Sequence, residues 1–304
     1  MEPTILFKGV DITEDVTIEQ YIHDSYAEQH ADTLLIKFSN SEGLWDKWNP
    51  ELEDEIEIIN GTEKTGIMFV KEKMPEPGYY TLRASSTPQI MQIKRSYSWE
   101  NVTFLQIAQE IAARNDMVLK KYGIQNQKYS FVAQNQERDL DFLENLCVLE
   151  GCAFIIFDKS LILYQEEYLE SQDALLVEID GQNNFHYSEE MLYSGCEINN
   201  GDIQYVYIKD ASYEYIAQKD IKNYITSKAE AERFAKNMLK FLNKNQKKGH
   251  FYTTPIAEGL TAGSVININT EDTESFDGKI FLTRVRHDYK KGQSKVFFRK
   301  VVER

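Results

Sequence analysis

One short pattern occurs twice in this chain, about 210 residues apart, and this repeat constrains the fold more than any other feature. Each copy contains three runs rich in β-branched and aromatic residues, separated by turns rich in Gly, Pro, Asp or Lys, which is typical of strands joined by hairpins. The first copy comprises residues 54–58, 66–70 and 80–84, and the second comprises residues 263–268, 278–282 and 295–299. Two similar β units in one chain predict a protein that supplies two equivalent building blocks to a larger ring. Convergence is the alternative, because any two β-meanders resemble each other.

The length of 304 residues is sufficient for two or three domains, each with its own core. We predict an α+β fold, mainly β, in three parts. Residues 1–95 and 171–304 are expected to be β units, the second with a helix at about residues 227–243. Residues 96–170 are expected to form a small α/β domain between them.

The middle part contains two helix patterns. Apolar residues recur at helical spacing over residues 104–112, and Thr103 with Gln106 forms a capping box at the start of this run. A second helix is predicted over residues 137–150, with Gly151 as the glycine that ends it. A hairpin with its turn at residues 158–160 is predicted to follow.

The last part contains one more helix among predicted strands. Ser227 and Glu230 form a capping box, and a run of basic residues suits the negative pole at the other end of this helix. Its apolar face is expected to consist of Ala231, Phe234, Ala235, Met238 and Leu242. Strands are predicted at residues 175–179 and 203–208.

Charge is distributed unevenly along the chain. The net charge is −15, and residues 1–170 account for all of it, whereas residues 279–304 carry 9 basic and 2 acidic residues. An acidic protein does not hold nucleic acid through its phosphates, but acidic groups can line a passage through which DNA slides. Solubility alone is the simpler explanation for most of these acids.

The N-terminal residues and the apolar runs of the sequence indicate where in the cell the protein is expected to be. No apolar run approaches the roughly 18 residues of a membrane helix. The N-terminal residues lack the basic start and apolar stretch of a signal peptide. We therefore expect the protein to be made in the cytosol and not to insert into a membrane.

Cysteine and tryptophan residues are expected to be core residues. Cys147, Cys152 and Cys196 form no CxxC pair and are interpreted as small buried hydrophobes. Trp45 and Trp48 are interpreted as a plug at the end of a strand pair, and Trp48→Ala is expected to cost about 3–5 kcal/mol. A carbohydrate-binding platform is the alternative reading of the two indoles.

No catalytic motif is present in the sequence. A phosphate-binding glycine loop, an HExxH pair and a GxSxG elbow are all missing. His23 and His30 lie near acidic residues, but their spacing matches no known metal-ligand pattern. We therefore predict no catalytic, cofactor-binding or metal-binding residues, no cofactor and no enzymatic activity.

Five stretches, in order along the chain, carry a family resemblance. They are residues 32–38 with 48–50 and 54–58; residues 104–112; residues 134–146 with 150–154; the helix from Ser227; and residues 260–265 with 284–289. The chain resembles the tail-hub proteins of the phage late-control gene D family, the central baseplate hubs of contractile phages, phage-derived bacteriocins and other contractile injection machines. This family is related to the hub part of type VI secretion VgrG proteins. The family usually has Gly-Asp where this chain has Glu53-Asp54.

The resemblance implies a structural role without catalysis. Such hubs are homotrimers in which each chain gives two tube-like β barrels, so that three chains present six barrels and join a six-fold tail tube to a three-fold spike. The implied partners are the tail tube protein, the central spike and other baseplate and tape-measure proteins, with DNA passing through the channel. The implied location is the baseplate of a virion or phage-like particle, and the match in length is best to the compact hubs of Gram-positive phages. In this picture His287 is a structural residue on a barrel strand.

Two alternatives remain open at this stage. One is a peptidoglycan-cleaving tail protein, and the other is a cell-surface-binding module that uses Trp45 and Trp48. The sequence does not distinguish an infectious phage from a prophage or a bacteriocin-like particle.

Overall fold

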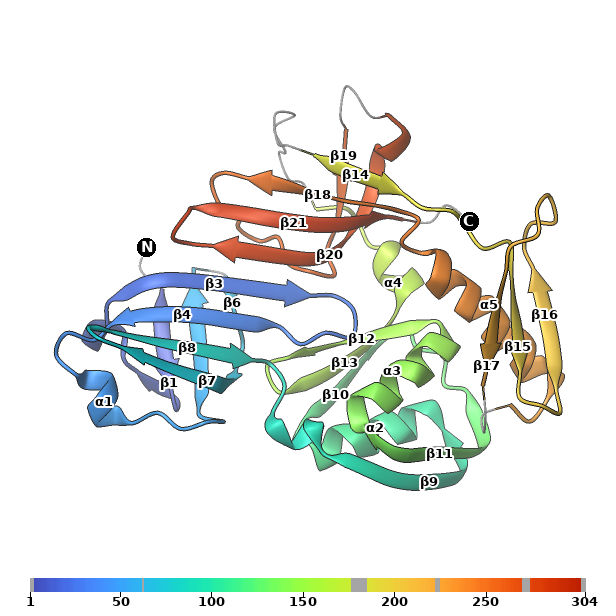
Figure 1. The fold of residues 1–304 in the computed structure, drawn as a ribbon, viewed down its shortest axis with the longest axis horizontal. Helices are drawn as coiled ribbons and strands as arrows, with labels where there is room; N and C mark the ends of the chain where they lie inside the picture. The colour runs from blue at the N-terminus through green and yellow to red at the C-terminus, as the bar shows by residue number, and fades with distance from the viewer. Residues whose placement is uncertain (1–2, 62, 176–184, 222–224, 270–273, 302–304) are drawn as a thin grey trace.

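The computed structural model describes residues 3–61, 63–175, 185–221, 225–269 and 274–301 (Figure 1). Strands dominate the structure, as the α+β, mainly β prediction required. The first β unit consists of β1 (Thr4–Phe7), β2 (Val10–Asp11), β3 (Ile18–Tyr26), β4 (Thr33–Ser39), β5 (Glu55–Asn60), β6 (Glu63–Lys64), β7 (Met68–Glu76) and β8 (Tyr79–Ser85). The second consists of β14 (His186–Glu189), β18 (Lys247–Thr253), β19 (Val265–Ile268), β20 (Gly278–Asp288) and β21 (Gln293–Lys300).

These two units form one continuous sheet. It has 13 strands in the order β14-β18-β21-β20-β3-β4-β8-β7-β5-β1-β2, with β19 beside β20 and β6 beside β5. The resemblance led us to expect two separate tube-like barrels. The described residues contain no closed barrel, because the second unit pairs with the first through β20 and β3 instead of closing on itself.

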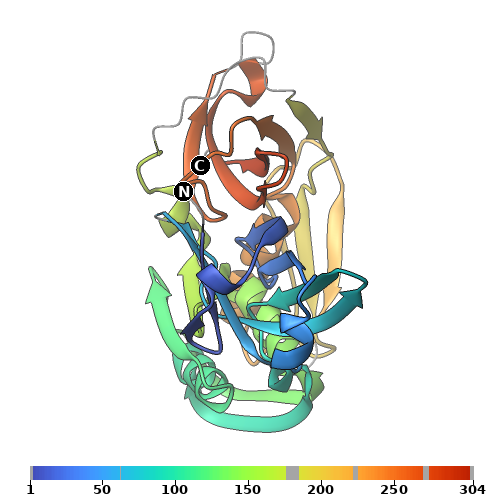
Figure 2. The same cartoon turned by 90° about the vertical axis from the view of Figure 1, so that its left-hand side faces the viewer.

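The second β unit, in orange and red, lies at the top of Figure 2, with the first unit, in blue, below it. In Figure 1 the remaining elements lie to the right of the first β unit, most of them below the second. They are β9 (Lys94–Thr103), α2 (Phe104–Arg114), β10 (Val118–Tyr122), β11 (Lys128–Arg138), α3 (Asp139–Glu150), β12 (Cys152–Phe157), β13 (Ser160–Gln165), α4 (Glu166–Glu170), β15 (Gly195–Asn199), β16 (Gln204–Ile208), β17 (Ile216–Asp220) and α5 (Lys228–Asn243). They make three small sheets, β10-β13-β12, β11-β9 and β16-β15-β17. Short helices complete the fold at α1 (Leu44–Trp48), η1 (Thr13–Asp15), η2 (Gln89–Gln92) and η3 (Glu274–Phe276).

The helix ends agree with the sequence predictions. Thr103 caps α2 in a capping box with Gln106, and Ser227 caps α5 in a capping box with Glu230. Gly151 ends α3 with a left-handed backbone, φ +66°, which glycine adopts without a Cβ penalty. The predicted hairpin is β12 and β13.

One hydrophobic core joins elements that the sequence assigned to different parts. Cys196, Ile198 and Phe234 lie in the same core cluster as Phe142 and Phe154. Residues of β15, β17 and α5 therefore pack with the middle α/β elements and not with the second β unit. The predicted division at residues 95 and 170 stays a prediction.

The structure also shows where the predicted cysteines, the apolar face of α5 and the strand at residues 175–179 lie. Cys147, Cys152 and Cys196 are buried free thiols, as expected. The predicted face of α5 is buried at Ala231, Phe234 and Ala235, while Met238 and Leu242 are only partly buried and Leu239 takes a core position. Of the predicted strand at 175–179, only Leu175 lies within the described residues, where it bridges Ile266.

No helix in the described part of the chain is both long and apolar enough to cross a membrane.

The core plug of the first β unit is Trp45, not Trp48. Trp45 is 1% exposed and lies among aromatic rings of the sheet, with its centroid 4.5 Å from that of Phe38 and 5.6 Å from that of Tyr80. Trp48 is half-buried at the edge of this cluster, 5.1 Å from Trp45. A binding platform of two exposed indoles is therefore absent from this end of the sheet.

We expect Trp45→Ala to lower the free energy of unfolding by about 3–5 kcal/mol, because it leaves a large cavity among rings that cannot collapse together. Trp48→Ala, which removes a half-buried ring, serves as the matched control and should cost less than about 2 kcal/mol. Urea denaturation of both variants measures the difference. Equal losses for the two variants would contradict the assignment of Trp45 as the plug.

Candidate functional site

The contact between β3 and β20 is the seam that joins the two β units. Residues 284–288 of β20 run antiparallel to residues 22–26 of β3, with Arg286 opposite Asp24 and His287 opposite His23. The backbone continues the ladder on both sides, because Ala27 N donates to Thr283 O and Tyr289 N donates to Tyr21 O, each at 3.0 Å. Segments about 260 residues apart thus form neighbouring strands.

Asp24 anchors this seam through two arginines. Arg284 Nη2 lies 2.8 Å from Asp24 Oδ1, and Arg286 Nη2 lies 2.8 Å from Asp24 Oδ2. The Asp24 side chain is only 4% exposed, so both guanidinium groups compensate for the removal of its charge from water. The ion pairs fix the register, since a shift by one residue moves both arginines to the other face of the sheet.

Two histidines face each other at the centre of the seam. His287 lies on β20 as expected, where its Nδ1 is 2.8 Å from Ser294 Oγ and its Nε2 is 3.1 Å from Leu260 O. Burial and, to a smaller extent, the neighbouring His287 together lower the pKa of His23 to about 4, against the opposing effect of Asp24. His23 is therefore neutral in the folded protein at pH 7.

We expect His23→Gln to make unfolding less sensitive to mild acid. The unfolded chain protonates His23 near pH 6.5 and the folded protein only near pH 4, so the wild type loses stability relative to the variant as the pH falls through this window. The loss is at most about 3 kcal/mol. Urea denaturation of both proteins at about pH 7.5 and about pH 4.5 measures it. An identical pH dependence in the two proteins would contradict the assignment.

A second charged cluster lies where the second β unit meets α4 and α5. Arg299 of β21 is fully buried, and its Nη1 lies 2.6 Å from Glu170 Oε1 while its Nε lies 3.3 Å from Glu28 Oε1. Lys244, at the end of α5, lies 2.7 Å from carboxylate oxygens of both Glu28 and Glu166. One network thus connects the β3–β4 connection, α4, α5 and β21.

The electrostatics of this cluster favour its charged state. Burial works to lower the pKa of Arg299, but the carboxylates of Glu28, Glu166 and Glu170 outweigh burial and raise this pKa above its usual value. Burial works to raise the pKa of Glu28, and Lys244 with Arg299 outweighs it and lowers this pKa. Removal of one member therefore leaves partners buried without full compensation.

We expect Arg299→Met to lower the free energy of unfolding by about 3–5 kcal/mol, because three carboxylates lose a buried cation. Arg138→Met is the matched control, since Arg138 pairs with Asp141 at the surface, and it should cost less than about 1 kcal/mol. Thermal or urea denaturation compares the two variants. A loss at Arg299 no larger than that at Arg138 would exclude a structural role for the cluster.

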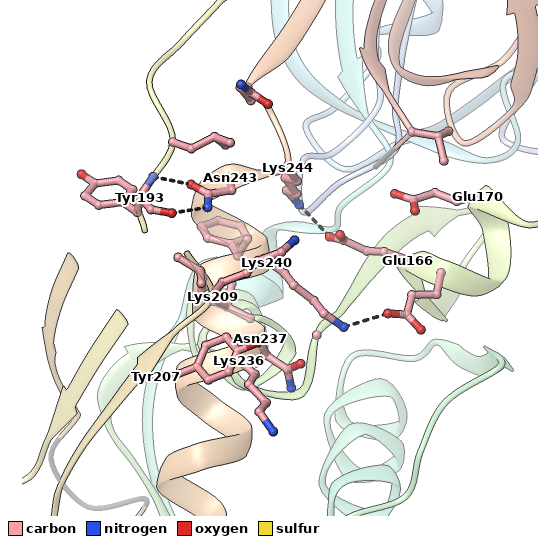
Figure 3. A pocket seen from close by; sticks show the side chains of 18 of the residues that line it. Glu166, Glu170, Tyr193, Tyr207, Lys209, Lys236, Asn237, Lys240, Asn243 and Lys244 are labelled. Carbon is pink, nitrogen blue, oxygen red and sulfur yellow. Dashed lines mark hydrogen bonds and ion pairs between the residues drawn. The ribbon is translucent and has the colours of Figure 1, made fainter. Parts of the chain in front are cut away.

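A cleft of about 790 Å³ adjoins this cluster, between α4, α5 and the segment around Tyr193 and Tyr207 (Figure 3). Three of its lysines lie against carboxylates: Lys240 is 2.8 Å from Glu167, Lys236 is 2.5 Å from Glu232, and Lys244 is 2.7 Å from Glu166. Part of the positive charge around the cleft is thus neutralised within the chain.

The two histidines near acidic residues, His23 and His30, have different neighbours in the structure. His30 packs its ring against Tyr26, with centroids 5.5 Å apart, while His23 faces β20. Across the described ranges, no group of three or more His, Cys, Asp or Glu side chains is placed to hold a metal ion.

The two β units correspond strand by strand. In the first unit the order is β3-β4-β8-β7-β5, and in the second it is β14-β18-β21-β20-β19. Each unit has a bulge at the same place, after Val70 in β7 and after Leu282 in β20. Because bulges are specific features of a fold, their agreement favours a true duplication over convergence.

The residues before the bulges make the same hydrogen bonds in both units. Glu53 N donates to Val70 O and Gly263 N donates to Leu282 O, both at 2.8 Å. Both donors have a left-handed backbone, with φ +73° at Glu53 and φ +87° at Gly263. Glu53 tolerates this conformation while its carboxylate binds Lys71 Nζ at 2.5 Å and the backbone N of Gln89 at 2.6 Å. Glu53 stands at the position where the late-control gene D family usually has glycine.

Comparison with known proteins agrees with this architecture. No family model and no curated protein sequence matches the chain. The structure is similar to the 43 kDa tail protein of prophage MuSo2 from Shewanella oneidensis, with a TM-score of 0.76 and 10% identity over 98% of each chain. It is also similar to a tail protein from Neisseria meningitidis MC58, with a TM-score of 0.76 and 12% identity over 98% of this chain and 96% of that chain.

A third similar structure comes from a secretion machine. The E. coli c3393 protein is a component of the type VI secretion system that exhibits structural similarity to the T4 bacteriophage tail proteins gp27 and gp5. It gives a TM-score of 0.66 and 12% identity over 98% of this chain and 77% of that chain. The fold of this chain is therefore a phage tail protein fold, which also occurs in a type VI secretion component.

Proposed function

We propose that this protein is the structural hub of a phage or phage-like contractile tail, of the late-control gene D type. The observation that carries the proposal is the duplicated β unit, found in a fold that matches two prophage or tail proteins over 96–98% of their length. A chain with two equivalent β units can take six positions in a ring with three copies. This is the geometry that an adaptor between a six-fold tube and a three-fold spike requires.

In this proposal the chain acts as a homotrimer without catalytic activity. Strands β1 to β8, within residues 1–95, and strands β14 and β18 to β21, within residues 171–304, provide the two tube-like β units, and the sheet closes into a tube on assembly. The tail tube protein binds on one side and the central spike on the other, with further baseplate and tape-measure proteins around them. Acidic residues of the chain then line a channel through which DNA passes without specific binding. The protein is made in the bacterial cytoplasm and resides in the baseplate.

The compact type of hub, expected from Gram-positive phages and phage-like particles, remains part of the proposal. The tail proteins from Shewanella and Neisseria have nearly the same extent as this chain, which supports the compact type without assigning the host. The particle itself can be an infectious phage, a prophage or a bacteriocin-like particle.

We expect the purified chain to form trimers at high concentration, with a mass three times the 35.4 kDa of one chain. Size exclusion with light scattering over a concentration series measures this mass, because association depends on concentration. If the chain alone is a monomer, co-production with the neighbouring tail tube and spike proteins should yield a complex with three copies. A chain that stays a monomer in both experiments would overturn the proposal.

A further inference from the structure

The duplication permits two strand pairings between a first and a second β unit, and only one of them occurs inside the chain. The later half of β20 pairs with β3 of the first unit. Its counterpart is the later half of β7, residues 72–76, and the counterpart of β3 is β14. In the ladders of the described residues, β14 is the last strand of the sheet, and β5 pairs with β7 only at Met68 and Phe69. Both counterparts therefore present an open edge, and in Figure 1 they belong to different β units.

The backbone at these edges faces outward. Thr283 O of β20 accepts from Ala27 N, one residue after β3, and Tyr289 N, one residue after β20, donates to Tyr21 O of β3. Alternate residues of a strand direct their N–H and C=O to the same side, so Val285 faces β3 as well. The counterpart of Val285 is Lys73, which pairs with Leu82 as Val285 pairs with Val296. The N–H and C=O of Lys73 thus point away from β8.

The same argument applies to β14. Glu190 N donates to Gln246 O, on the β18 side, at 2.9 Å. The neighbouring residue Glu189 therefore directs its N–H and C=O to the outer edge of the sheet. Ser25 is its counterpart in β3, and Ser25 lies opposite Val285 in the internal seam.

We propose that β7 of one copy pairs with β14 of the next copy, antiparallel and in the register of the internal β3–β20 seam. This inference rests on the trimer of the proposed function and adds the surface that closes it. Three copies then use three internal and three intermolecular seams in alternation. The register places Lys73 opposite Glu189 of the next copy, Met74 opposite Ser188 and Glu72 opposite Glu190.

The charges on the two strands favour this pairing. Lys73 and Glu189 are oppositely charged and directly opposite, which stabilises a cross-strand pair. Glu72 and Glu190 are like-charged, but Arg83 binds Glu72 at 2.6 Å and Lys248 binds Glu190 within each chain.

An exposed methionine marks the end of the same edge. Met191 is 77% exposed, whereas its counterpart in the internal seam, Ala27, is fully buried. In the proposed register Met191 N faces Lys71 O, as Ala27 N faces Thr283 O. Assembly thus covers an apolar side chain that the single chain leaves in water.

The residues of the intermolecular seam make it weaker than the internal seam. The ion pair of Asp24 with Arg286 is replaced by the neutral pair of Ser188 with Met74. Pro75, in the outward-facing position after Lys73, has no N–H to donate. Proline at an open edge also limits pairing with unrelated strands. The internal seam therefore forms as the chain folds, and the intermolecular seam depends on concentration.

Disulfide trapping tests the register. Met74 and Ser188 form a pair that does not share backbone hydrogen bonds, with Cα atoms about 4.5 Å apart, which is within the range of a disulfide. We expect the double variant Met74→Cys with Ser188→Cys to give covalent trimers on mild oxidation, seen on a denaturing gel. The three native thiols are buried, so they do not compete.

Matched variants control for chance contact. Met74→Cys with Glu190→Cys is out of register by two residues, with side chains roughly 7–8 Å apart, and should give no covalent trimer. Lys73→Pro removes an N–H that faces the open edge and not β8, so it should leave the fold intact and weaken trimer formation at least tenfold, measured by light scattering. Lys73→Ala should retain the trimer.

The outcomes separate this inference from the proposed function. Covalent trimers from the in-register pair alone support the seam. A wild-type trimer that forms while the in-register pair gives no product, or that withstands Lys73→Pro, overturns the seam and leaves the hub proposal standing. Covalent products longer than three copies overturn the closed ring. Absence of any trimer, also with the tube and spike proteins present, overturns both.

Discussion

The pairing of β3 with β20 is the interaction on which the rest of this architecture depends. Asp24 is buried between Arg284 and Arg286, and this ion pair holds segments about 260 residues apart in one register. Replacement of either arginine would leave the buried Asp24 charge without full compensation, which is strongly unfavourable. The seam therefore converts two small β units, which would each have open edges, into one sheet of 13 strands.

The duplication explains why one chain can carry two similar units with different surroundings. The β7 bulge and the β20 bulge agree, and so do the hydrogen bonds of Glu53 and Gly263. The units differ where they meet the other elements. Arg299 and Lys244 tie the second unit to α4 and α5 through shared carboxylates, whereas the first unit is filled by Trp45 and its aromatic neighbours. Equivalent frameworks thus support different contacts, as the proposed adaptor between two symmetries requires.

Many local features could be predicted from the sequence because they depend on neighbouring residues. The capping boxes of Thr103 and Ser227 and the glycine end at Gly151 were predicted and are present. Long-range features could not be predicted in the same way. The position of Trp45 rather than Trp48 in the core depends on rings from three strands. Arg299 was visible as a basic residue at the end of an apolar strand, but its acidic partners lie 129 residues or more away.

The sequence by itself determined the positions of most strands and helices, the repeat of the β unit and the absence of recognised catalytic motifs, because these follow from local hydrogen bonding and from the order of residue types. Only the tertiary structure decided that the two units share one sheet instead of closing as separate barrels. It also decided that residues of β15, β17 and α5 belong to the core of the middle elements. The physical reason is that a strand edge accepts any neighbour of suitable register, so its partner is selected by buried ion pairs and side-chain packing between distant parts of the chain.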